Sequence, residues 1–365
     1  MHERIYVCHT YYHVYVTCLK ELARKDPAAA VDASKATLVL SKMSTGFGTL
    51  AERARTCGLF EEVIEFDEKR DDFFPELAPL RKNTGSIITN MFNRIRFCKR
   101  YAELEAPYVP VDFRQYKDIY VFCDSDPVGY YLNANRIPYH AVEDGLNCLK
   151  HFHAAKFDNR GAFGVKAWMA RMGWIFIQNG YAKYCIDMEV NDVSVIPDEG
   201  TGAKPRYVEV PRRGLVDALT EDGKRLLCDL FIENMDELRT ALSQGADKPR
   251  ILVLTEKIFD ETERSERFAE IVNRYRTWNG KETVVMVKPH PRDETDYRKV
   301  FAGNGDTVVL ASNFPVEMLN YIEGLAFDAV VAVFTQTDAI RFAQERISLR
   351  DEFTWAAPEN VQAGT

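Results

Sequence analysis

The sequence predicts an α/β fold with two domains, each organised around a parallel sheet. The chain has 365 residues, against about 150 for an average domain. Short apolar runs alternate with segments of helical periodicity in its first and last parts. These runs are apolar at nearly every position, which is typical of parallel strands covered by helices on both faces. We expect an N-terminal α/β domain over residues 1–155, a connecting and largely helical region over 156–248, and a C-terminal α/β domain over 249–365, with a cleft between the two domains.

In the N-terminal domain the expected strands are apolar runs bounded by polar or turn residues. The helices between them repeat apolar residues every three to four positions, as Val14, Cys18 and Leu22 do in the first. The expected strands are 4–8, 37–40, 62–66, 119–123 and 139–142, and the expected helices are 11–23, 49–57 and 127–135.

The connecting region starts with an aromatic and basic stretch and ends in a helix over 220–243. Alternation then resumes, with strands at 250–254, 283–287, 307–310 and 329–334 and helices at 264–278, 315–321 and 338–345. Ligands of open parallel sheets bind beyond the carboxyl ends of the strands. The residues that follow each strand are therefore the candidates for a site.

Composition and charge exclude several classes of protein. The chain is 46% hydrophobic and 28% charged, as soluble globular proteins are. Its net charge of −8 argues against a nucleic-acid partner, which needs a broad basic face. The eight cysteines form no CxxC pair, so we expect buried thiols in a reducing compartment and no metal site. We find no signal peptide and no apolar run long enough to span a membrane, and we expect a cytoplasmic protein.

The segment Lys288-Pro289-His290-Pro291-Arg292 directly follows an expected strand. The two prolines fix the backbone and keep His290 out of a helix. A rigid histidine between two cations suits a phosphate, because it donates a hydrogen bond and can protonate a leaving oxygen. A capping turn with solvated basic residues is the alternative, and the compactness of the cluster favours the site.

The segment Glu143-Asp144-Gly145 follows the strand expected at 139–142. Two adjacent carboxylates can provide a general base, because burial and mutual repulsion raise one pKa, and glycine permits a tight turn. An acidic turn that caps a helix explains the same residues equally well.

Hydroxyl groups follow the strand expected at 329–334. Thr335 and Thr337, with the backbone amides of a following helix, would form an anion site. Asp338 competes for the same amides, so helix capping is nearly as good an explanation.

Two further features are less specific. Glu317 lies in the first turn of the helix expected at 315–321, where it can accept both hydroxyls of a ribose, although a capping arrangement with Asn313 is favoured by spacing alone. Residues 46–51 match the dinucleotide pattern GxGxxA, and Asp67 follows about twenty residues later. That loop follows the second strand of the chain, so a phosphate-lined or acceptor-lined loop at Gly46 is an equally good interpretation.

Taken in order, these motifs resemble the bacterial sialyltransferases, and most closely glycosyltransferase family 52, the lipooligosaccharide and capsular sialyltransferase group. The resemblance rests on strand-EDG, strand-KPHPR, FPVE and a hydroxyl-rich turn, preceded by Cys8-His9-Thr10 after the first strand. It spans most of the chain and implies a GT-B fold of two Rossmann-like domains. It also implies an inverting transfer from CMP-sialic acid that needs neither a metal nor a cofactor.

On the donor side, the resemblance implies that His290 contacts the CMP phosphate and protonates it as it leaves. This chain has TQTD where adjacent serines are usual in the family, which puts the phosphate contact there in doubt. The other donor-binding residues would be Lys288, Arg292, Glu317, Thr335 and Thr337.

On the acceptor side, the acidic motif of related sialyltransferases supplies the base, which nominates Asp144, with Glu143 close behind. Family 52 also has an acid after the first strand of its second half, which makes Asp260 the rival base. Without the family, Asp260 is better explained as a solvated loop acid before a helix. His9, Thr10 and Gly46 would line the acceptor side or the cleft.

We therefore expect an inverting, metal-independent sialyltransferase that acts on a terminal galactose of a bacterial surface glycan, either lipooligosaccharide or capsule. The alternatives are another GT-B transferase with a different nucleotide-activated donor, a dinucleotide oxidoreductase, and a non-catalytic nucleotide-sugar-binding protein.

Two stretches could bring the protein to a lipid-linked acceptor. Residues 93–100 hold four cations, and residues 165–176 combine two tryptophans with basic residues. A solvated helix face and a domain core explain them more simply than peripheral contact with the inner face of the plasma membrane. A homodimer is compatible with the sequence.

Overall fold

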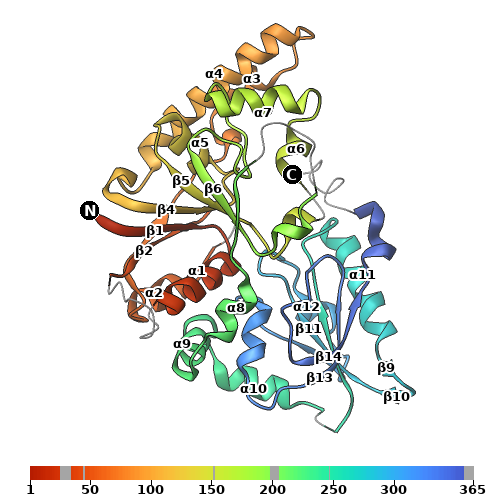
Figure 1. The fold of residues 1–365 in the computed structure, drawn as a ribbon. Helices are drawn as coiled ribbons and strands as arrows, with labels where there is room; N and C mark the ends of the chain where they lie inside the picture. Colours follow the sequence, from red (N-terminus) through yellow and green to blue (C-terminus); the bar gives the residue numbers. More distant parts are fainter. Residues whose placement is uncertain (25–33, 44–45, 151–152, 198–204, 246, 357–365) are drawn as a thin grey trace. The chain divides into compact units, whose positions relative to one another are not determined.

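The computed structural model describes residues 1–24, 34–43, 46–150, 153–197, 205–245 and 247–356. The chain forms two compact units, Met1–Leu219 and Thr220–Thr365. Each has its own parallel sheet with helices packed on it (Figure 1).

The sheet of the first unit has seven parallel strands in the order β3-β2-β1-β4-β5-β6-β7. Strand β2 is buried along its whole length, as expected of an apolar strand covered on both faces. The strands are β1 (His2–Cys8), β2 (Ala36–Ser41), β3 (Phe60–Phe66), β4 (Tyr116–Phe122), β5 (Tyr139–Val142), β6 (Cys185–Val190) and β7 (Tyr207–Glu209).

Helices and short 3₁₀ turns connect these strands. Helix α1 also neutralises a buried cation of β1. Arg4 pairs with Glu21 of α1 at 3.0 Å, and the Tyr6 hydroxyl donates to the same carboxylate at 2.8 Å. The helices are α1 (Tyr11–Arg24), α2 (Leu50–Thr56), α3 (Ala78–Arg81), α4 (Ile87–Glu105), α5 (Pro127–Ala134), α6 (Ala154–Asp158), α7 (Phe163–Met172) and α8 (Arg212–Asp217). The 3₁₀ turns are Asp71–Phe73, Pro75–Leu77, Ala106–Tyr108, Phe113–Gln115, Cys148–Lys150 and Val193–Val195.

The sheet of the second unit has five parallel strands in the order β12-β11-β8-β13-β14. The strands are β8 (Arg250–Leu254), β11 (Val284–Lys288), β12 (Thr307–Val309), β13 (Phe327–Ala332) and β14 (Ala343–Ser348), and β9 (Thr277–Trp278) pairs with β10 (Lys281–Glu282) in a separate ribbon. The helices are α9 (Glu221–Phe231), α10 (Met235–Ser243), α11 (Glu261–Arg274) and α12 (Tyr297–Val300), with 3₁₀ segments at Val316–Tyr321 and Arg350–Ala356.

Most expected strands are present, and three expectations need correction. The segment expected as a helix at 338–345 leads into edge strand β14 instead, whose mostly exposed residues give no apolar run. The helix expected at 220–243 is two helices, because Asn234 accepts the amide of Glu237 and caps α10. The region 156–248 adds β6 and β7 to the first sheet and α9 and α10 to the second unit, so it is divided between the units.

Candidate functional site

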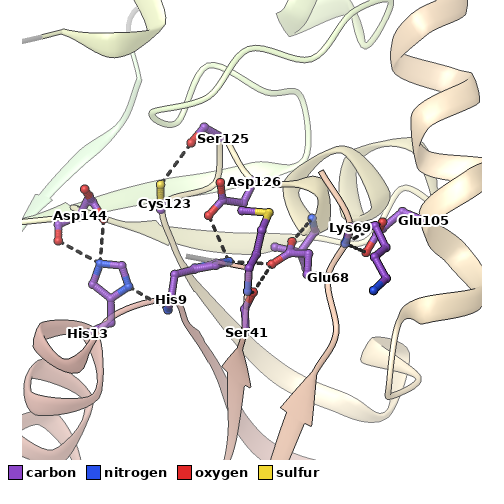
Figure 2. Close-up of polar contacts among 12 residues, drawn as sticks. His9, His13, Ser41, Glu68, Lys69, Glu105, Cys123, Ser125, Asp126 and Asp144 are labelled. Carbon is purple, nitrogen blue, oxygen red and sulfur yellow. Dashed lines mark hydrogen bonds and ion pairs between the residues drawn. The ribbon is translucent and has the colours of Figure 1, made fainter. Parts of the chain in front are cut away.

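In the first unit, the polar residues that follow strands β1 to β5 lie together at the carboxyl edge of the sheet (Figure 2). The chain supplies His9 after β1, Ser41 at the end of β2, Glu68 after β3, Asp126 after β4 and Asp144 after β5. Because parallel strands all end at the same edge, this grouping follows from the topology.

His9 is buried between two carboxylates. Its Nε2 lies 2.9 Å from Glu68 and 3.2 Å from Asp126. Glu68 also accepts hydrogen bonds from the Ser41 hydroxyl at 2.6 Å and from the Val128 amide at 2.7 Å. Burial opposes a charged His9, but Asp126 and Glu68 outweigh it and raise the pKa of His9 to about 9. The two carboxylates thus favour the charged form of His9, which links the ends of three strands.

His13 is a neutral ring that orients Asp144 (Figure 2). The amide of His9 donates to its Nδ1 at 3.0 Å, so the ring proton must reside on Nε2. Nε2 then donates to the Asp144 carboxylate at 2.8 Å and to the Asp144 carbonyl at 2.9 Å. Burial lowers the pKa of His13, and the ring stacks on Phe122 with centroids 4.6 Å apart. The side chain of Asp144 is 53% exposed, so this oriented carboxylate is accessible to a ligand.

The two acids of the EDG motif have different surroundings. Glu143 is buried, accepts the Asn191 amide at 2.8 Å and lies 3.7 Å from Arg212. Burial raises the pKa of Glu143 to about 7, although Arg212 opposes the shift. Glu143 is thus held inside the fold, whereas Asp144 faces solvent.

In the second unit, His290 follows β11 and is held on both sides by hydrogen bonds. Its amide donates to the Thr255 hydroxyl at 3.1 Å, and its Nδ1 accepts the Arg292 amide at 3.1 Å. The proton of the ring therefore resides on Nε2. Thr255 is fixed in turn by Asp293 at 2.8 Å, and Asp293 pairs with buried Arg264 at 2.6 Å.

This geometry has a chemical consequence for His290. A neutral ring with its proton on Nε2 can donate a hydrogen bond to an anion. A charged ring would carry a second proton on Nδ1, where it would face the amide of Arg292 and break that bond. The arrangement therefore supports hydrogen-bond donation by His290 more directly than proton transfer.

Lys288 and Glu317 lie inside the same edge of the sheet. The Lys288 ammonium donates to the carbonyls of Pro289 and Ser312, both at 3.1 Å, and lies 4.3 Å from the centre of the Phe314 ring. Burial lowers the pKa of Lys288 to about 7, with Glu317 opposing. Burial raises the pKa of Glu317, with Lys288 opposing. Lys288 thus braces two loops.

Glu317 lies in the 3₁₀ segment Val316–Tyr321, whose N-terminal boundary residue Pro315 makes no side-chain capping hydrogen bond.

The hydroxyl-rich turn is already occupied by a carboxylate from the chain itself. Oε1 of Glu256 accepts the Thr335 amide at 2.6 Å, the Thr335 hydroxyl at 2.5 Å and the Phe334 amide at 3.3 Å. Thr337 lies in a following turn, where its carbonyl accepts the Ile340 amide at 3.0 Å. No helix begins there, so the expected helix dipole is absent from this turn.

Asp260 is the N-cap of α11. It accepts the amides of Thr262 at 2.9 Å and Glu263 at 3.0 Å. It also lines a shallow hollow with Glu263, Glu266, Glu270 and Arg267, so most of its charged neighbours there are acidic. Helix capping accounts for its position without a catalytic role.

Thr10 and Gly46 have local structural explanations. The Thr10 hydroxyl accepts the His13 amide at 3.2 Å where α1 begins. The Gly46 carbonyl accepts from the Tyr11 hydroxyl at 3.5 Å, and a Cβ at Gly46 would meet open space. Part of the GxGxxA loop, residues 44–45, lies outside the described residues.

Four residues of these two edges were not predicted from the sequence: His13, Glu68, Asp126 and Glu256. Only His13 had a local indication, because it lies one helical turn after His9. Among the described residues, no group of three or more His, Cys, Asp or Glu side chains is arranged to hold a metal ion. The helices described also include none that is long and apolar enough to cross a membrane.

The model of glycosyltransferase family 52 matches residues 91–340, which is more than half of the chain. The chain belongs to glycosyltransferase family 52. Two solved structures of sialyltransferases from Photobacterium have similar folds. Their sequences are only 10% and 11% identical to this chain, so the similarity concerns the fold. The first, an α/β-galactoside α-2,3-sialyltransferase from Photobacterium phosphoreum, has a TM-score of 0.51 and covers 94% of this chain and 89% of its own. The second, the GT-B domain of a sialyltransferase from Photobacterium damselae, has a TM-score of 0.52 and covers 99% and 96%.

These similarities establish the GT-B fold expected from the sequence. A curated relative, an uncharacterized protein of Haemophilus influenzae, is 29% identical over 90 residues. That match covers 25% of this chain and 26% of the relative, so this chain spans about a quarter of the relative's length.

Proposed function

We propose that this family 52 protein is an inverting, metal-independent sialyltransferase. It moves sialic acid from CMP-sialic acid to a terminal galactose of a bacterial surface glycan, either lipooligosaccharide or capsule. Family membership and the fold shared with two sialyltransferases support the proposal. The observation that carries it is the fixed tautomer of His290, which places an N–H donor beside Arg292 at the carboxyl end of β11.

On the donor side, His290 stabilises the phosphate of CMP as the bond to sialic acid breaks. The departing oxygen gains negative charge in the transition state, so a hydrogen bond to it strengthens as the reaction proceeds. The exposed side chain of Arg292 adds a positive charge, and Glu317 binds the hydroxyls of the ribose. Lys288 keeps the loops that carry these groups in place.

On the acceptor side, Asp144 removes the proton of the attacking hydroxyl. Its support is the contrast with the other acids: Glu143 is held inside the fold, and Asp260 is engaged as a helix cap. A base must be within hydrogen-bond reach of the proton that it takes, and an exposed, oriented carboxylate meets this need when the acceptor binds. Inversion requires that the acceptor hydroxyl attack the sialic acid from the side opposite the departing phosphate, so the base and the phosphate-binding donor have separate roles.

We also propose that the protein contacts the inner face of the plasma membrane, where a lipid-linked acceptor would lie. The support is an apolar surface on two helices of the first unit: Ile87 is 82% exposed on α4, Trp168 is 50% exposed on α7, and Trp174 just beyond α7 is 51% exposed. The amide and carbonyl of Phe176 contact α4 through Cys98 and Arg94, which brings the two segments together. A position of residues 165–176 in the domain core does not account for these exposed side chains.

The composition of this surface suits the edge of a bilayer. The same two helices carry further exposed apolar side chains and several cations, and basic and aromatic residues together favour anionic lipid surfaces. The additional apolar residues are Ile88, Phe92, Val165 and Met172, and the cations on the same helices include Arg96, Lys99, Arg100 and Arg171.

The experiment that tests the proposed activity combines binding and transfer. CMP, CDP, UDP and NAD are compared by calorimetry, and CMP-sialic acid is then incubated with galactose-terminated acceptors and the products are weighed by mass spectrometry. We expect CMP to bind most tightly and one sialic acid to be added per acceptor. Tighter binding of UDP or NAD contradicts the proposal, and CMP binding without hydrolysis or transfer identifies a non-catalytic binding protein instead.

A further inference from the structure

Glu256 occupies a central position at the carboxyl edge of the second sheet. It follows Thr255 directly after β8, and β8 lies between β11, which leads to His290, and β13, which leads to Thr335. Thr255 holds the amide of His290 at 3.1 Å, and Glu256 holds the amide of Thr335 at 2.6 Å. Two successive residues of one strand end thus fix the loops on both sides of it.

The groups around Glu256 are those that bind phosphate in other proteins. Two backbone amides and one hydroxyl converge on a single carboxylate oxygen, as they would on a phosphate oxygen. Arg292 is near enough to favour the charged form of Glu256, against the burial that raises the pKa of this carboxyl. The turn at 334–335 therefore binds an anion already, and that anion belongs to the protein.

Because Glu256 fills this turn, fewer hydrogen-bond donors remain for a ligand along this edge of the sheet. One phosphate group can take a hydrogen bond from Nε2 of His290 and the charge of Arg292. A second phosphate beside it would need donors of its own, and those of the turn at 334–335, which follows β13 on the other side of β8, are already taken by Glu256. It would also meet the negative charge of that carboxylate in a partly buried place, where repulsion is weakly screened.

We propose that Glu256 restricts the donor to sugars linked through one phosphate, by filling the turn that a second phosphate group would need. This inference rests on the proposed function, because it concerns the choice between nucleotide donors at the same edge. Glu256 acts here by exclusion: it adds nothing to the binding of a nucleoside monophosphate and makes a diphosphate unfavourable.

CMP and CDP test the inference, because they share base and ribose and differ by one phosphate. Calorimetry gives the CMP-to-CDP affinity ratio for the wild type, Glu256→Gln and the control Glu266→Gln, which removes an exposed acid from α11. Glutamine keeps an oxygen that can accept the Thr335 amide, so the turn is retained while the charge is lost. We expect CDP to bind Glu256→Gln at least about tenfold more tightly than the wild type, with CMP unchanged within about threefold and the control unchanged.

Retained CMP binding shows that the Glu256→Gln protein is folded. If the glutamine variant binds neither nucleotide, the CMP-to-CDP affinity ratio of Glu256→Ala decides the question. An unchanged CMP-to-CDP ratio in a folded variant overturns the inference and leaves the proposed function standing. An equal gain for both nucleotides also overturns it, because Glu256 would then repel any phosphate. A wild type that binds CDP or UDP more tightly than CMP refutes the proposed function together with the inference.

Discussion

Two substitutions at His290 separate hydrogen-bond donation from proton transfer. His290→Gln places an amide N–H₂ near the position of Nε2 and keeps a donor, but an amide cannot give up a proton at neutral pH. His290→Asn places an amide oxygen near the position of Nδ1, where it can accept the Arg292 amide that Nδ1 accepts at 3.1 Å. The asparagine variant therefore keeps the turn and loses the donor.

The size of each effect follows from the chemistry of the lost group. A hydrogen bond to a charged acceptor contributes about 1.5–3 kcal/mol, which corresponds to about a 10- to 150-fold change. General acid catalysis contributes about 10²- to 10⁴-fold. Because Nδ1 is already an acceptor, we expect His290 to act as a donor, so His290→Gln should keep kcat within about tenfold and His290→Asn should lose about 10- to 150-fold.

The assay is single-turnover transfer at saturating CMP-sialic acid, followed between pH 6 and pH 9. A neutral donor ring keeps its proton on Nε2 as the pH rises, so the wild-type rate should not fall across this range on account of His290. A charged imidazole acid would lose activity above the ordinary imidazole pKa near 6.5. A loss of 10² or more in His290→Gln, with a wild-type rate that falls above that pH, would refute the tautomer argument and identify His290 as the acid.

Three further predictions concern the choice of base, the exposed tryptophans and the buried Lys288. Asp144→Asn should lose transfer by about 10²- to 10⁴-fold with CMP affinity unchanged, whereas Asp260→Asn should leave transfer intact and cost at most about 1 kcal/mol of stability, since asparagine also caps helices. Replacing both Trp168 and Trp174 by serine should weaken binding to phosphatidylglycerol vesicles by at least about tenfold in co-sedimentation, because each buried aromatic side chain contributes about 1.5–3 kcal/mol. Folding lowers the pKa of Lys288 to about 7. Between about pH 7 and pH 10 the unfolded chain therefore keeps a proton on Lys288 that the folded chain has lost. The stability of the wild type relative to Lys288→Met should then rise with pH in urea melts.

Matched controls separate these effects from general damage. Phe73 is 55% exposed in the first unit but lies outside the α4 and α7 surface, so Phe73→Ser should leave vesicle binding unchanged. Lys299 is an exposed cation on α12, so Lys299→Met should show no comparable pH dependence. Equal losses in these controls would contradict the surface and burial arguments. Transfer that survives in Asp144→Asn and fails in Asp260→Asn would reverse the choice of base.

The fold could be predicted wherever burial left a continuous apolar run. The strands at 139–142 and 250–254 have the predicted bounds, because turn or charged residues flank four or five residues that are mostly buried. Strand β6 could not be found this way, since Asp187 and Glu189 interrupt it. Their partners are distant in sequence: His140 lies 2.7 Å from Asp187, and Lys20 lies 2.5 Å from Glu189. Strand β14 is an exposed edge and has almost no apolar pattern to detect.

The candidate site was predictable only where one short segment carries the chemistry. His290 lies between two prolines and Asp144 follows a strand, so both are visible in a few residues of sequence. The groups that decide their roles come from elsewhere in the chain. His13 lies 131 residues from Asp144, and Glu256 lies 79 residues from Thr335. No spacing rule connects such pairs, because their contact depends on the order of strands in the sheet.

The two candidate histidines reach the same protonation state through the same kind of contact. A backbone amide donates to Nδ1 in each case, from His9 to His13 and from Arg292 to His290. Each ring then presents its proton at Nε2, and a second proton would cost the hydrogen bond that positions the ring. If both rings act as fixed donors, the proton that leaves the acceptor hydroxyl passes to a carboxylate, and the charge that develops on the departing phosphate is met by a hydrogen bond. The reaction then needs no histidine to change its charge, which is why the glutamine variant of His290 is the decisive test.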